Sequence, residues 1–362
     1  MLNNIRNGIR FFSIFTKIKE SKLPILHSCN YNINLNLATE EFIFEKLSLS
    51  NPALYFYRSK SCVVIGKHQN PWKECHIQEM QKNQICLSRR KTGGGAVYQD
   101  LGNTCFSFLI PIEKDSKLDF TKANQDIIAN TMAKLNVKAT FSGRNDILVD
   151  NKKISGSAYK LHPGKSILHH GTMLINLNKE EATKYLNPHK SKLLSKGISS
   201  VKARIANLQE FNSEINHEHF CEKMMQAFEE KYKQKSDHFE ITYEDCMKEE
   251  YIKKEFEKSE SWEWKYGESP MFSNNFIIRF DWGIIDMNIE VKEGIIIDGI
   301  LYSDCLYSSF IEKINELIKS KKYHYSHEGF TKLGEDLKNF FYHDKIILGF
   351  IEAMVEGIID QL

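Results

Sequence analysis

The stretch from Arg89 to Asn103, RRKTGGGAVYQDLGN, combines residue types that bind anions. The consecutive glycines Gly93, Gly94 and Gly95 weaken helices and strands, but they allow a backbone to adopt positive φ angles or to approach a ligand closely. Backbone N–H groups in such a turn form a concavity for an anion, and a neighbouring arginine adds a planar, permanently charged donor. Arg90 stands beside the glycines. The stretch therefore predicts a loop that holds a phosphate-sized anion.

Two common nucleotide-binding fingerprints are not met by this sequence. The dinucleotide pattern G-x-G-x-x-G fails because Tyr98 stands in place of its third glycine. Gly164-Lys165-Ser166 has the form of the end of a P-loop, but Tyr159 stands where that motif requires its first glycine. On composition alone, a flexible surface turn with solvated arginines is therefore an alternative interpretation of the glycine stretch.

A second group of candidate residues lies on a predicted hairpin that turns at Asp150-Asn151. Lys153 begins the second strand of this hairpin, beside Asp146 on the first strand, and the small residues Ser155-Gly156-Ser157 follow it. Small residues let a ligand lie close to the backbone. Taken by itself, however, a lysine in such a hairpin is most often a solvated charge.

Seven segments of the chain, in this order, resemble the lipoate–protein ligase A family. They are VVIGKHQNPWKEC (63–75), RRKTGGGAVYQDLGN (89–103), SGRNDILV (142–149), KISGSAYK (153–160), HHGTMLIN (169–176), YLNPHKSKLLSKGISSVKARIANL (185–208) and WEWKYGESPMFS (262–273). The resemblance covers most of the chain. It implies an α/β catalytic domain like that of biotin ligases and, distantly, class II aminoacyl-tRNA synthetases, followed by a smaller C-terminal α+β domain.

The resemblance also implies a reaction in two steps. Lipoate and ATP give lipoyl-AMP and pyrophosphate, and the lipoyl group then passes to a specific lysine of an acceptor protein. The implied acceptors are the lipoyl domains of 2-oxoacid dehydrogenases (E2 subunits) and the glycine cleavage H protein, and the implied cofactors are ATP and Mg²⁺. A transferase that uses preformed lipoyl-AMP shares the same domains, although intact SGRND and HHG segments favour the full ligase. A silent acceptor-binding protein is an alternative of another class, and an octanoyltransferase would need a thioester-forming cysteine near the site.

The family motifs assign roles to individual residues of this sequence. Lys153 is the implied catalytic residue, in contact with the lipoyl carbonyl oxygen and the α-phosphate, and Asp146 is the implied residue on the Mg²⁺ side. The stretch SKGISSVKAR resembles a segment that folds over the adenylate and excludes water. The residues implied to bind ATP and lipoyl-AMP are Arg90, Gly93, Gly94, Gly95, Ala96, Val97, Tyr98, Asn145, Lys153, His170, Lys196 and Arg204.

A lysine suits the first step for a physical reason. When a carboxylate attacks the α-phosphorus of ATP, two anions approach each other and charge builds on the phosphoryl oxygens. An ammonium group within hydrogen-bond reach of both lowers this barrier by electrostatic preorganisation, and such a contact is worth roughly 3–4 kcal/mol. A general base is hardly needed, because lipoate is already ionised. For this reason we expect His170 to belong to the binding pocket or to the core rather than to act in proton transfer.

The bulk composition limits the possible partners. The chain has 362 residues, 41% of them hydrophobic and 27% charged, which suits a globular protein of two domains. A formal net charge of +2, without a block of six like charges, argues against nucleic acid as the main partner. No apolar stretch is long enough to span a bilayer. We expect a monomer that binds neither nucleic acid nor membrane.

The eight cysteines occur without any C-x-x-C pair, and several lie in apolar, strand-like runs. We therefore expect reduced, mainly structural thiols and an intracellular compartment. Metal-ligand spacing is also lacking, because Cys75 and His76 are adjacent and His217-Glu218-His219 does not follow the H-E-x-x-H pattern.

The first 22 residues have the pattern of an organelle transit peptide. Leu2, Ile5 and Ile9 fall at helical spacing opposite Arg6 and Arg10, and no acidic residue precedes Glu20. We expect a mitochondrial protein, or a cytoplasmic one if this segment is not a transit peptide. The expected domains are 1–22 for the transit peptide, 23–265 for catalysis and 274–362 for the C-terminal accessory domain.

The expected elements follow from hydrophobic periodicity and turn residues. Helices are predicted at 36–48, 71–82, 120–135, 217–233 and 244–258, with two or three more at the C-terminus. Strands are predicted at 54–57, 62–65, 85–88, 103–110, 137–141, 146–149, 153–157, 172–177, 275–280, 284–291 and 295–301. In this arrangement, the glycine loop follows the strand at 85–88, and Lys153 begins the strand at 153–157.

Overall fold

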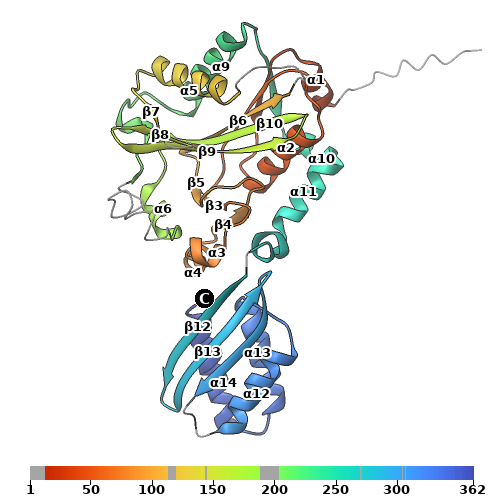
Figure 1. Ribbon diagram of the computed structural model, residues 1–362, viewed down its shortest axis with the longest axis vertical. Helices are drawn as coiled ribbons and strands as arrows, with labels where there is room; N and C mark the ends of the chain where they lie inside the picture. The colour runs from red at the N-terminus through yellow and green to blue at the C-terminus, as the bar shows by residue number, and fades with distance from the viewer. Residues whose placement is uncertain are drawn as a thin grey trace, which may run out of the picture.

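The computed structural model describes residues 13–112, 120–142, 145–187, 204–269, 271–303, 305 and 307–362. Figure 1 shows an α/β catalytic domain at one end of the molecule and a smaller domain of strands backed by helices at the other. Both domains expected from the sequence are present, and the mixed α/β fold class is confirmed.

An eight-stranded sheet forms the centre of the catalytic domain, in the order β11-β1-β2-β6-β10-β9-β8-β7. Its strands are β1 (Pro24–Ser28), β2 (Ala53–Tyr57), β6 (Asn103–Pro111), β7 (Thr140–Ser142), β8 (Asp146–Val149), β9 (Lys152–His162), β10 (Ser166–Leu174) and β11 (Asp237–Ile241). β1 pairs in parallel with β2 and β11, and the remaining neighbours are antiparallel. Strands β8 and β9 form the expected hairpin.

The two faces of this sheet are covered by different helices (Figure 1). Helices α5 (Phe120–Lys134) and α9 (His217–Tyr232) cover one face over an apolar core that includes Phe106, Met173 and Phe228. Helix α2 (Ile33–Glu45) packs on the other face, with α1 (Ile14–Glu20), α10 (Tyr243–Lys248) and α11 (Glu250–Glu260) beside it. Helix α2 begins at Ile33, earlier than predicted, because the Asn32 side chain accepts hydrogen bonds from the backbone N–H groups of Asn34 and Leu35.

A small three-stranded sheet lies below the large one in Figure 1, in the order β4-β3-β5. It consists of β3 (Cys62–Ile65), β4 (Cys86–Arg89) and β5 (Val97–Gln99), and the glycine loop connects β4 to β5. The predicted helix 71–82 is divided into α3 (Pro71–Glu74) and α4 (Ile77–Lys82), which pack near α6 (Lys179–Tyr185). The division falls at Cys75, which is extended and pairs with Leu186.

The C-terminal domain has its own sheet and its own core. Strands β12 (Phe272–Phe280), β13 (Gly283–Lys292), β14 (Ile295–Ser303) and β15 (Tyr323–His324) form an antiparallel sheet in chain order. Helices α12 (Ser308–Ser320), α13 (His327–Phe340) and α14 (Lys345–Ile359) cover one side of it. Among the described residues, no helix combines the length and apolar character needed to cross a membrane.

The joint between the domains is aromatic and hydrogen-bonded. A short 3₁₀-helix, η1 (Leu208–Glu210), and a π-helix, η2 (Glu263–Gly267), complete the catalytic domain, and η2 leads into β12. Trp72 of α3 contacts the rings of Tyr266, Phe272 and Tyr325 at centroid distances of 5.0–5.3 Å. Arg89 is fully buried, and its guanidinium donates to carbonyls at 264–265 and to those of the loop after β3. These contacts anchor the connecting segment to the small sheet.

Candidate active site

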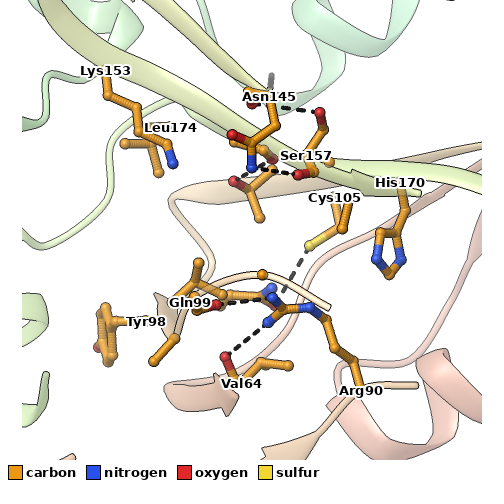
Figure 2. Close-up of a pocket in the computed structure, with 18 of the residues that line it drawn as sticks. Val64, Arg90, Tyr98, Gln99, Cys105, Asn145, Lys153, Ser157, His170 and Leu174 are labelled. Atoms are coloured by element: carbon orange, nitrogen blue, oxygen red, sulfur yellow. Dashed lines mark hydrogen bonds between the residues drawn. The ribbon is translucent and has the colours of Figure 1, made fainter. Parts of the chain in front are cut away.

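A cavity of about 390 Å³ lies between strands β8–β10 of the large sheet and the glycine loop. Figure 2 shows Lys153, Asn145, Ser157 and His170 on one side of it and Arg90, Tyr98 and Val64 on the other. The cavity therefore brings the two groups of residues that the sequence suggested to within reach of one ligand.

The glycine loop is braced from behind by Arg90. The Arg90 guanidinium donates to the carbonyl oxygens of Val64, Gly93 and Gly95 at 2.8–3.2 Å. Burial lowers the pKa of this arginine to about 10, so it keeps its charge at neutral pH. We expected Arg90 to hold nucleotide phosphates directly. In the structure, its donors hold the loop in shape, and Arg90 also lines the cavity. Its contact with phosphate stays a prediction.

The glycines have distinct steric roles. Gly94 adopts φ of +100°, and a Cβ atom there would lie 2.8 Å from the Arg90 guanidinium. By contrast, a Cβ atom at Gly93 or Gly95 would meet nothing within 4 Å. The open side of the loop is thus available to a ligand, as an anion-binding loop requires. Beyond the loop, Ala96, Val97 and Tyr98 line the cavity. Their contact with nucleotide stays a prediction.

Lys153 reaches the cavity from the start of β9 and forms an ion pair with Asp146. Its Nζ atom lies 2.7 Å from Asp146 Oδ1, and the other carboxylate oxygen, Oδ2, accepts from Arg204 at 2.9 Å. Burial raises the pKa of Asp146, but the two adjacent cations outweigh this effect and hold the pKa below its usual value. Asp146 therefore positions the two cationic side chains next to each other.

Space for the Lys153 amine is provided by Gly156. A Cβ atom at Gly156 would lie 2.5 Å from Lys153 Nζ and 2.7 Å from Cε. Sequence reasoning noted the small residues after Lys153 as room for a ligand. The structure shows that Gly156 makes room for the lysine side chain itself. Asn145, also a predicted site residue, lines the cavity and donates from Nδ2 to the Ser157 carbonyl at 2.9 Å.

His170 lines the cavity, whereas its neighbour His169 points to the opposite face of β10. His170 Nε2 lies 2.8 Å from Thr92 Oγ1, and its Nδ1 lies 2.8 Å from Glu40 Oε2. Glu40 and Thr92 were missed by the sequence analysis. Glu40 lies on α2, far from the motifs in sequence, and no local pattern distinguishes it from the adjacent Glu41.

The remaining wall of the cavity is largely apolar. Its apolar residues come from α2, β2, β3, β6, β9, β10 and α6 and from the segments next to them or before η1, and they are Leu37, Tyr57, Val64, Cys105, Ala158, Leu174, Leu177, Ala182, Leu186 and Ile205. Burial raises the pKa of the Cys105 thiol to about 12. This thiol is therefore protonated and a poor nucleophile. All eight cysteines are free, in agreement with the sequence-based expectation.

Two predicted features have no structural support in the described part of the chain. Lys196 lies outside the described residues. No group of three or more His, Cys, Asp or Glu side chains among the described residues is arranged to hold a metal ion. The carboxylates in the cavity wall are those of Asp146 and Glu74, and Asp146 already pairs with Lys153 and Arg204.

Models of known families match both domains. The lipoyl protein ligase A/B catalytic domain matches residues 32–229, and the bacterial lipoate protein ligase C-terminus matches residues 269–349. Lipoate-protein ligase A of Psychrobacter cryohalolentis is 42% identical over 309 residues, which cover 83% of this chain and 89% of that protein.

Solved structures give the same relationship. The crystal structure of P. falciparum LipL1 in complex with lipoate is 30% identical with a TM-score of 0.60 and covers 93% of this chain and 99% of that one. A Thermoplasma acidophilum bipartite lipoate protein ligase with its E2 lipoyl domain is 26% identical, with a TM-score of 0.59 over 68% and 96% of the chains. Lipoate-protein ligase A bound with ATP is 25% identical, with a TM-score of 0.58 over 68% and 99%.

Proposed function

The chain belongs to the lipoate–protein ligase A family and is a lipoate–protein ligase, and we propose that it both activates lipoate with ATP and transfers the lipoyl group to acceptor proteins. Support comes from relatives of known structure, one in complex with lipoate and another bound with ATP. The observation that carries the proposal is the position of Lys153, whose amine faces the same cavity as the open side of the glycine loop.

In the first step, the acyl chain of lipoate occupies the apolar part of the cavity and its carboxylate lies at the Lys153 amine. A carboxylate oxygen attacks the α-phosphorus of ATP, the bond from that phosphorus to the bridging oxygen breaks, and pyrophosphate leaves. Lys153 stabilises the negative charge on the carboxylate and the α-phosphate, while backbone N–H groups of the glycine loop hold the phosphates. The product is lipoyl-AMP.

In the second step, the deprotonated ε-amine of an acceptor lysine attacks the acyl carbon of lipoyl-AMP. The carbon–oxygen bond of the mixed anhydride breaks, AMP leaves with its phosphate, and an amide forms. Lys153 again polarises the acyl oxygen. We propose lipoyl domains of E2 subunits and the glycine cleavage H protein as acceptors, supported by the relative whose structure includes its E2 lipoyl domain.

Magnesium enters this proposal as part of the MgATP substrate. Each oxygen of Asp146 already pairs with a cation, one with Lys153 and the other with Arg204. No step is therefore assigned to a protein-bound metal. Asp146 instead holds Lys153 in place.

Lipoate-dependent exchange of labelled pyrophosphate into ATP tests the proposal. A full ligase catalyses this exchange, because formation of lipoyl-AMP is reversible. A transferase restricted to preformed lipoyl-AMP shows no exchange but moves the lipoyl group from synthetic lipoyl-AMP to an acceptor. A silent acceptor-binding protein does neither. An octanoyltransferase with a thioester intermediate is disfavoured by the raised pKa of Cys105, the cysteine in the cavity wall.

A mitochondrial location is also proposed, on the basis of the basic, acid-poor start of the chain. Residues 1–12 lie outside the described part, whereas Phe15 and Ile18 of α1 are buried in the catalytic core. If the leader is cleaved, cleavage before Ile14 preserves this packing. N-terminal sequencing of the protein isolated from mitochondria checks both points, and recovery of the intact chain from the cytoplasm contradicts them.

Gel filtration tests the expected monomer.

A further inference from the structure

We infer that Thr92, His170 and Glu40 form a buried hydrogen-bond chain that positions the glycine loop for the nucleotide, with Thr92 as a positioning residue. The inference rests on the proposed function, because it assigns the loop to ATP. Thr92 is not among the described residues that line the cavity, so its contribution acts through its neighbours rather than through contact with a ligand.

The chain runs from the glycine loop across three other elements. Arg90 Nε lies 3.1 Å from Thr92 Oγ1, which lies 2.8 Å from His170 Nε2 on β10. His170 Nδ1 lies 2.8 Å from Glu40 Oε2 on α2, and the other Glu40 oxygen accepts from Ser107 on β6 at 2.5 Å. Each of these five side chains is at least 91% buried.

Two donors in this chain are fixed by chemistry. The Arg90 N–H group can only donate, so Thr92 Oγ1 accepts from it. The Glu40 carboxylate accepts, so His170 Nδ1 carries the hydrogen of that contact. Thr92 and His170 together connect a buried cation to a buried carboxylate. Both ring nitrogens are engaged, which argues against His170 as a general base.

Loss of the Thr92 hydroxyl is expected to change the shape of the glycine loop. Arg90 also donates to the carbonyls of Gly93 and Gly95, so the position of its guanidinium decides the shape of the turn between them. Removal of the Thr92 hydroxyl leaves buried His170 Nε2 without this partner and removes one of the two acceptors of Arg90 Nε. An unsatisfied buried polar group is costly, so the side chains rearrange and the loop loses its ordered form. Lipoate binds on the apolar side of the cavity and is affected little.

Equilibrium binding of ATP to the full chain tests the inference. Thr92→Val keeps the shape of the side chain and removes the hydroxyl, and we expect the Kd for ATP to rise about tenfold. Thr92→Ser keeps the hydroxyl and restores the wild-type Kd within about twofold. The Kd for lipoate alone stays within about twofold in both variants. The matched control is Thr131→Val, which removes another fully buried hydroxyl, on α5 and away from the cavity.

An unchanged Kd for ATP in Thr92→Val overturns the inference, as does an equal rise in Thr92→Ser or in Thr131→Val. A double variant, Thr92→Val with Glu40→Gln, adds a second criterion. If the residues act as one chain, its Kd rises by clearly less than the product of the two single effects. A rise in Kd equal to the product of the two single effects contradicts the inference that the residues act as one chain. Pyrophosphate exchange by the wild type is measured separately, so failure of the proposed function is distinguished from failure of this inference.

Discussion

The two faces of strands β8–β10 are built from neighbouring residues, but one face lines the cavity and the other packs in the apolar core. On the cavity face lie His170 and Thr172, with the charged pair Asp146 and Lys153 beside them. On the far face the next residues along β10, His169 and Met173, pack under α5 and α9. Side-chain alternation along a strand thus separates chemistry from stability within a single segment.

The far face also shows what burial does to a titratable side chain. His169 stacks on Tyr159 at a centroid distance of 4.0 Å and lies 3.2 Å from the Asn124 amide. Burial, together with the neighbouring His170, lowers its pKa to about 3, so it is neutral at physiological pH. The adjacent His170, by contrast, connects four polar side chains around the glycine loop. Substitutions on the two faces are expected to separate activity from stability.

The largest expected effect is the loss of activity in Lys153→Ala. Removal of the ammonium takes away charge stabilisation in the transition state, and we expect pyrophosphate exchange to fall about 10²–10³-fold. Thermal unfolding is expected to change much less than activity, because Asp146 keeps its pair with Arg204. Lys231→Ala, which removes a surface lysine paired with Asp126, is the matched control. Normal turnover in Lys153→Ala contradicts the site assignment.

The corresponding substitution on the far face is Met173→Ala. Met173 is completely buried in the apolar core, so we expect the free energy of unfolding to fall by about 2–4 kcal/mol. At 20 °C, the folded fraction is expected to retain its kcat. Urea unfolding and pyrophosphate exchange measure the two quantities. A large loss of kcat with unchanged stability would show that the division between the faces is wrong.

Acidification tests the buried histidine of the far face. Unfolded histidine binds a proton near pH 6.5, whereas folded His169 has a pKa of about 3, so the unfolded state binds more protons between these values. The stability that depends on neutral His169 is therefore fully present above about pH 6.5 and is lost as the pH falls below that value. We expect His169 to account for about 2 kcal/mol of the loss between pH 7.5 and pH 5.

The measurement is urea unfolding at both pH values, followed by circular dichroism. In His169→Gln the loss of stability on acidification is expected to be smaller by about that amount. His68→Gln, which changes an exposed histidine, serves as the control and keeps the wild-type pH dependence. Equal pH dependence in His169→Gln and the wild type would argue against a neutral, buried His169.

The smallest expected effect concerns Gly156→Ala on the cavity face. The added Cβ atom would lie 2.5 Å from Lys153 Nζ, so the flexible lysine is pushed aside while the backbone keeps its fold. Misplacement of a catalytic group lowers the rate, and we expect kcat for exchange to fall about tenfold with little change in stability. Gly349→Ala, where a Cβ meets nothing within 4 Å, is the control. Wild-type kcat in Gly156→Ala would show that the amine acts from another position.

Much of the fold could be predicted from local pattern. The predicted helix at 120–135 is present as α5, and the hairpin around Asp150-Asn151 is present as β8 and β9, because both have clear periodicity and turn residues. The helix predicted at 244–258 is divided into α10 and α11 at Glu249, whose extended backbone ends the first helix. The motif residues Lys153, Asp146 and Gly94 do lie around one cavity.

The family could be recognised from the sequence alone, and the anion-binding glycine loop and the lysine hairpin could be predicted, because the motifs depend on residue types at short spacing. Three features depend on the tertiary structure: Arg90 braces the loop, Gly156 makes room for Lys153, and Glu40 reaches His170. The physical reason is distance along the chain. Glu40 and His170 are 130 residues apart, and their contact exists only because α2 packs across β6 and β10.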